Sequence, residues 1–147
     1  MKKLFLILSL TYLFSCGISD DNSDNVTPQA VRVEWHLIKV TGGISGVNNN
    51  FELYDIVWEF NDETGQFTVN NTNEDSSIED GLDSGTYVFS ILKEDSSNYF
   101  IVNDTEFANI LVDNNAGEMT LDQNVTTAGV GSDGYIYYFK SIIIYSE

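Results

Sequence analysis

Apolar and polar residues alternate with a period of two over most of the chain after residue 30, and this pattern constrains the fold more than any other feature. The alternation is clear over residues 33–37, 54–60, 66–70 and 87–92, and it recurs more weakly over 99–103, 106–113 and 119–122. Successive side chains of a strand point to opposite faces, so such alternation indicates strands that are buried on one face. Together with the nearly continuous apolar segment 135–145, the pattern predicts about eight strands and no helix.

Turn-forming residues separate these runs closely enough to join neighbouring strands as hairpins. Residues 61–65 and 113–117 are rich in Asn, Asp and Glu and both end in glycine, which is typical of the longer hairpin loops. Residues 42–46 contain three glycines, but no helix is expected after them, so they predict a flexible loop and not a phosphate cradle. Consecutive hairpin-connected strands can remove their exposed edges by closing on themselves. The predicted fold is therefore all-β, an antiparallel up-and-down barrel of about eight strands.

The first sixteen residues carry the features of a bacterial lipoprotein signal. Two lysines precede an apolar stretch over residues 4–14 that is too short to span a bilayer. Leu13, Ser15 and Cys16 then occupy the positions of a lipobox, in which the cysteine thiol accepts diacylglycerol. An ordinary secretory signal with a chance cysteine is the alternative, but Cys16 is the only cysteine in the chain. We predict a signal peptide over residues 1–15, lipidation of Cys16, and a membrane as the partner of this anchor.

Residues 16–30 are polar, acidic and without periodicity, and we predict that they form a flexible tether. Within them, Ser19, Asp20 and Asp21 resemble the acidic export signal of Bacteroidetes surface lipoproteins, and a plain solvated linker is the alternative. These features predict a lipid-anchored protein of the outer membrane at the cell surface, with the periplasmic face as the alternative location.

The acidic charge balance argues against two kinds of partner. The formal net charge is −17, although the predicted leader contributes two lysines, and such a balance argues against nucleic acid and against flat docking on anionic lipid. A disordered acidic chain is also excluded, because 42% of the residues are hydrophobic and 13% are aromatic.

No catalytic machinery or cofactor site is evident in the sequence, so we predict a protein that is not an enzyme. His36 is the sole histidine, and the alternation directs it away from Trp35, so we expect an exposed side chain on the outer face of a strand. A single histidine excludes a histidine-rich zinc site. Carboxylates gather in the loop 71–84, where the EF-hand pattern is absent, and a solvated acidic loop is the expectation with calcium binding as the alternative.

The order of motifs over residues 31–147 resembles the lipocalin-like domains of Bacteroidetes lipoproteins. The resemblance implies an up-and-down barrel over this range, and the wider lipocalin family often binds small hydrophobic ligands inside the barrel. The motifs that carry it, in chain order, are Trp35-His36-Leu37, Gly42-Gly43, Gly46, Ile56-Val57-Trp58-Glu59-Phe60, Phe67-Thr68-Val69-Asn70-Asn71, Ser84-Gly85-Thr86-Tyr87-Val88-Phe89 and Asp133-Gly134.

Six large aromatic side chains fall on the inward phase of their predicted strands, and they are the candidate ligand-binding residues: Trp35, Trp58, Phe60, Phe67, Tyr87 and Phe89. They either line a ligand cavity or fill a packed core, because an eight-stranded barrel is just wide enough for one or the other. Six large rings would take up much of the interior of such a barrel, so a packed core is favoured over a ligand cavity. The predicted function is a membrane-anchored, non-enzymatic barrel lipoprotein that binds a small hydrophobic ligand. The alternative is a surface interaction or structural module with a filled barrel.

Overall fold

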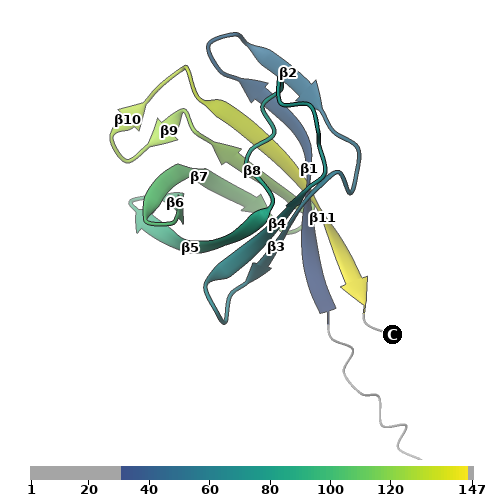
Figure 1. Cartoon of the computed structure of the whole chain (residues 1–147). Coiled ribbons are helices and arrows are strands. Elements are labelled where there is room, and N and C mark those ends of the chain that lie inside the picture. Colours follow the sequence, from purple (N-terminus) through teal and green to yellow (C-terminus); the bar gives the residue numbers. More distant parts are fainter. Residues whose placement is uncertain (1–30, 146–147) are drawn as a thin grey trace, which may run out of the picture.

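The structure, a computed structural model, describes residues 31–145, so the predicted signal peptide, Cys16 and the tether lie outside the described residues. From Val31 to Tyr145 the chain forms strands and turns and contains no helix. Eight strands close into an antiparallel barrel, which confirms the predicted fold class (Figure 1). A search of the same residues for a helix long and apolar enough to cross a membrane finds none.

The barrel strands follow one another around the barrel in chain order, and the last pairs with the first. They are β1 (Val31–Gly42), β3 (Ile56–Asn61), β4 (Gln66–Asn71), β5 (Gly85–Glu94), β6 (Ser97–Val102), β7 (Thr105–Asp113), β8 (Glu118–Asp122) and β11 (Tyr135–Tyr145). Pairing of β1 with β11 runs from Val31 opposite Tyr145 to Gly42 opposite Tyr135, with an irregularity between Leu37 and Lys39. This long ladder closes the barrel.

Three short strands lie outside the eight, and the alternation pattern did not predict them. Strand β2 (Val47–Asn50) pairs with the end of β1, so the predicted loop 42–46 is the turn between these two strands. Strands β9 (Val125–Thr126) and β10 (Gly129–Val130) form a small hairpin between β8 and β11. None of the three was visible as a strand, because each is too short to show an apolar–polar period.

One end of the barrel, which we call the capped end, is covered by the connection between β4 and β5, residues 72–84. Leu82 of this connection packs against the core, and the Tyr137 hydroxyl donates a hydrogen bond of 2.8 Å to the Glu79 carboxylate. Burial raises the pKa of Tyr137 well above its usual value, and the neighbouring Glu79 carboxylate adds to the effect, so the hydroxyl stays protonated and remains a donor. The predicted acidic loop is therefore a lid that is fastened to the barrel interior.

The packed core lies in the middle of the barrel and is built around Trp58 on β3. The Trp58 side chain is fully buried, and its ring lies near five others, those of Phe60, Phe67, Phe100, Phe107 and Phe139, with centroids 4.9–6.4 Å away. Aliphatic side chains complete the core; among them are Leu37, Val40, Ile56, Val69, Ile110 and Leu121. At the level of Trp58 the barrel is filled by side chains.

Gly134, directly before β11, occupies a place that leaves no room for a methyl group. A Cβ there would lie 2.7 Å from the Gln123 side chain and 2.8 Å from the Gln123 backbone. We expect Gly134→Ala to lower the unfolding free energy by about 1–3 kcal/mol, because the surrounding backbone must shift. Gly131→Ala is the matched control, since its nearest neighbour would be 3.9 Å away. Urea unfolding checks both, and equal losses would contradict the steric argument.

Candidate functional site

The end of the barrel opposite the capped end is open, and we call it the mouth. It is formed where β1 begins and β11 ends, at the exit of both termini of the described chain (Figure 1). A hollow of about 520 Å³ lies here, lined by Arg32, Val33, Trp35, Phe60, Asp62, Asn114, Gly117, Ser141 and Ile143. A smaller hollow of about 180 Å³ shares three of these residues and is otherwise apolar, lined by Trp35, Phe60, Asp62, Phe89, Ile91, Phe100, Ile110, Val112 and Met119.

Exposure of inward-facing apolar side chains shows that the mouth is open. Val33 lies opposite Ile143 in the β1–β11 ladder. Both side chains point to the same, inward face as the buried pair Leu37 and Phe139. Val33 is nevertheless 40% exposed and Ile143 52% exposed. On β5, Ile91 pairs with the buried Phe100 and is itself 40% exposed. The inward face thus stays apolar beyond the packed core, where no segment of the described chain covers it.

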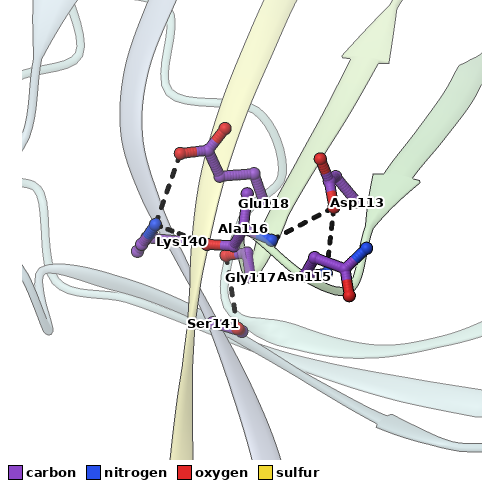
Figure 2. Close-up of polar contacts among 7 residues, drawn as sticks. All are labelled: Asp113, Asn115, Ala116, Gly117, Glu118, Lys140 and Ser141. Atoms are coloured by element: carbon purple, nitrogen blue, oxygen red, sulfur yellow. Dashed lines mark hydrogen bonds and ion pairs between the residues drawn. The ribbon is translucent and has the colours of Figure 1, made fainter.

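The polar wall of the mouth is held by a fixed loop. Residues 113–117, which connect β7 to β8, are held against β11 by Lys140 (Figure 2). The Lys140 ammonium donates a hydrogen bond of 2.6 Å to the Ala116 carbonyl and forms an ion pair of 3.3 Å with the Glu118 carboxylate. The Ser141 hydroxyl and backbone N–H both donate to the Gly117 carbonyl. Asn114, which the same loop carries, therefore lines the larger hollow from a defined position.

The six predicted aromatic residues separate by depth. Trp58 and Phe67 are 0% and 1% exposed and belong to the packed core, whereas Trp35, Phe60 and Phe89 line the mouth. Tyr87 stacks on Phe67 with a centroid distance of 5.3 Å, and its hydroxyl donates 2.9 Å to the Asp83 carbonyl of the lid. Three of the six are thus placed to meet a molecule in the mouth.

Sequence reasoning missed the aliphatic half of the mouth. Ile91, Ile110, Val112, Met119 and Ile143 line the hollows but were not among the candidate site residues. Ile91 lies in a clear run, in which the aromatic residues stood out, and the other four belong to the weaker runs and to the nearly continuous final segment. Their only signal was the inward phase that they share with the aromatic residues.

His36 is not exposed, so that prediction was wrong. Its side chain points away from Trp35 as expected, but it is 0% exposed because residues 51–55, between β2 and β3, fold over the outer face of β1. The Tyr54 backbone N–H donates 3.0 Å to Nδ1, and the Tyr54 ring meets the imidazole edge-on at 4.6 Å. The other ring nitrogen, Nε2, lies 3.3 Å from the Glu34 carboxylate. The same carboxylate accepts a hydrogen bond of 2.7 Å from the Arg32 guanidinium.

This burial predicts a loss of stability in mild acid. Burial lowers the pKa of His36 below its usual 6.5, although the Glu34 carboxylate opposes the shift. Above pH 6.5 neither the folded nor the unfolded chain protonates this ring; below it, the unfolded chain takes up a proton first, so stability falls by at most about 1.4 kcal/mol per pH unit. An NMR titration follows the single histidine directly. A midpoint at or above 6.5 would contradict the prediction, and His36→Gln should remove this part of the pH dependence.

Two carboxylates of the acidic loop, those of Asp75 and Asp80, accept hydrogen bonds from nearby residues. Asp80 accepts from the amides of Asn71 and Asn73 at 2.9 Å and 2.8 Å, and Asp75 accepts from the Ser77 backbone and hydroxyl. Between Val31 and Tyr145 no three His, Cys, Asp or Glu side chains come together as metal ligands would. These contacts give the loop a structural part in closing the capped end.

Comparisons with protein-family models, with curated proteins and with solved structures found no match to this chain.

Proposed function

We propose that this chain is a membrane-anchored, non-enzymatic lipoprotein whose barrel mouth binds a small hydrophobic ligand. The observation that carries the ligand proposal is an apolar hollow that is open at one end of a barrel closed by a fastened lid at the other. The lipobox ending at Cys16, the acidic step at residues 19–21 and the resemblance to lipocalin-like domains of Bacteroidetes support the anchor and a cell-surface location.

Size and chemistry of the mouth suit a small apolar molecule. Ligand pockets are mostly apolar, with a few polar groups that fix orientation, and typically measure about 300–1,000 Å³. The larger hollow, of about 520 Å³, falls in this range, and its lining is mixed, with Arg32, Asp62, Asn114 and Ser141 as polar groups. The apolar hollow of about 180 Å³ is smaller than this range and adjoins the larger one at Trp35, Phe60 and Asp62, so the apolar part of the ligand would occupy it and the rest would extend into the larger hollow. The core around Trp58 is filled, so the ligand would lie between this core and the open end of the mouth, against Trp35, Phe60 and Phe89.

Two consecutive residues on opposite faces of β5 give a matched test. Ile91 lines the hollow and is 40% exposed, whereas Leu92 is 46% exposed and points outward. N-phenyl-1-naphthylamine, a neutral apolar dye, is the probe, and its fluorescence should rise on binding to the wild-type chain. We expect Ile91→Asp to weaken dye binding at least about tenfold, equivalent to about 1.4 kcal/mol, because it places a carboxylate in the hollow. Leu92→Asp should bind the dye like the wild type.

Equal effects of the two substitutions, or no dye binding at all, would overturn binding in the mouth. Native mass spectrometry of the protein taken from its own membrane adds a second measurement, since a retained small molecule is expected. A clean mass without ligand, together with no dye binding, would leave the interaction module as the better proposal, with residues 72–84 as its presented surface.

A further inference from the structure

We infer that the mouth end of the barrel lies against the lipid bilayer, so that the apolar ligand passes between the acyl chains and the mouth without crossing water. This inference rests on the proposed anchor at Cys16 and adds the orientation of the barrel and the source of its ligand. Three observations support it: where the chain enters the barrel, where its exposed apolar side chains lie, and how its charges are distributed.

The chain enters the barrel at the mouth. Val31, the first described residue, begins β1, and the next two residues, Arg32 and Val33, already line the larger hollow. Residues 17–30 separate this point from Cys16, and a segment of that length reaches at most about 50 Å when fully extended. An anchor at Cys16 is therefore connected to the barrel at the mouth and not at the capped end.

Several exposed apolar side chains border the mouth, although the two most exposed, Ile44 and Val130, lie at the opposite end. We define the apolar rim as Val33, Ile91, Leu92, Leu111, Val112 and Ile143, which are between 40% and 62% exposed. Each lies in the part of its strand that borders the mouth, as the register of β1, β5, β7 and β11 requires. Exposed apolar side chains that cluster at one rim are typical of a contact with a partner or a membrane.

Charge is less negative at the mouth end than at the capped end. Five carboxylates of residues 72–84 cover the capped end, whereas three of the four basic side chains between residues 31 and 145 lie near the mouth. These three are Arg32, Lys93 and Lys140, and only Lys39 lies toward the capped end. The strand ends and turns of the mouth also carry six carboxylates, which are Asp62, Glu63, Glu94, Asp95, Asp113 and Glu118. The mouth end is therefore net negative, but less so than the capped end, and repulsion from anionic lipid is strongest at the capped end.

The two tryptophans report this orientation at different depths. Trp35 lines the mouth, whereas Trp58 is 0% exposed in the core. The chain from Cys16 onward, with its thiol coupled to a maleimide lipid in phosphatidylcholine vesicles, is the sample, because the core and the barrel pairings lie within residues 31–145. Bromine on the acyl chains quenches tryptophan on contact. We expect Trp58→Phe, which keeps Trp35, to lose emission in brominated vesicles, and Trp35→Phe to keep its emission.

Rim substitutions in the wild-type chain provide a test that does not change the core. Ile143→Asp and Leu92→Asp should reduce quenching because each puts a charge on the rim. The matched control is Val130→Asp, at the 84% exposed tip of the β9–β10 hairpin, which should leave quenching unchanged. Leu92→Asp separates the two proposals, since it is expected to keep dye binding and lose membrane contact.

Three outcomes would overturn the inference. The first is Trp35 emission that is the same in brominated and unbrominated vesicles. The second is a loss of quenching in Val130→Asp as large as in Ile143→Asp and Leu92→Asp. The third is a dimer in which a second copy covers the mouth, detected by analytical ultracentrifugation. Chemical coupling places the anchor whether or not cells lipidate Cys16. A failed orientation is therefore distinguishable from a failed anchor.

Discussion

Trp58→Ala is expected to lower the unfolding free energy by about 3–5 kcal/mol, the range for large aromatic residues removed from a packed core. The ring is fully buried and lies near five other aromatic rings, so no neighbour can close the space that alanine leaves. A domain of this size is stable by only about 5–15 kcal/mol, and the variant should therefore be partly unfolded or close to it. Urea unfolding followed by far-UV circular dichroism measures the change.

Two controls show whether the ring itself is responsible. Trp58→Phe keeps an aromatic ring and removes an indole N–H that has no hydrogen-bond partner among the described residues, so we expect a much smaller loss. Trp35→Ala removes the same side chain from the mouth, where it is only partly buried, and should also cost less. If Trp35→Ala destabilised the chain as much as Trp58→Ala, the core would not be centred where we place it.

Cys16→Ser should abolish lipid labelling and move the protein from the membrane fraction to the soluble fraction. A serine hydroxyl cannot replace the thiol that accepts diacylglycerol, and the chain has no other cysteine. Because stable anchoring requires more than one acyl chain or a second signal, removal of the modified cysteine should release the protein completely. Metabolic labelling with a radioactive fatty acid, followed by fractionation, measures both effects.

The acidic residues that follow provide the comparison for that experiment. Asp20→Asn combined with Asp21→Asn leaves the lipobox intact, so lipid labelling should persist. If the acidic step acts as an export signal, the double variant should become less accessible to protease added to whole cells. A Cys16→Ser protein that stays in the membrane fraction would show that the lipobox interpretation is wrong.

The alternation of apolar and polar residues was enough to predict the barrel, because each barrel strand buries one face. It could not predict β2, whose Val-Asn-Asn-Asn sequence has no alternation, and this omission explains the error at His36. The segment that covers His36 follows β2 and folds back over β1. Burial on an outer face depends on a distant segment, and the pattern within one strand contains no information about it.

The candidate site was predicted only in part, for a related reason. Inward phase assigns a side chain to the barrel interior, but it does not say how deep along the axis the side chain lies. Trp58 and Trp35 lie directly opposite each other on paired strands, yet one is in the packed core and the other at the open mouth. The difference arises because the lid residue Gly81 lies next to the Trp58 ring, whereas no similar lid covers the mouth among the described residues.

Closure of the barrel by β1 and β11 has a consequence for how the chain folds. The two strands come from opposite ends of the domain, and their first pair joins Val31 to Tyr145. Contacts between residues so distant in sequence form slowly, and without them both β1 and β8 keep an unpaired edge. The barrel cannot close until the last strand has been synthesised, so an incomplete chain exposes the edges of β1 and β8.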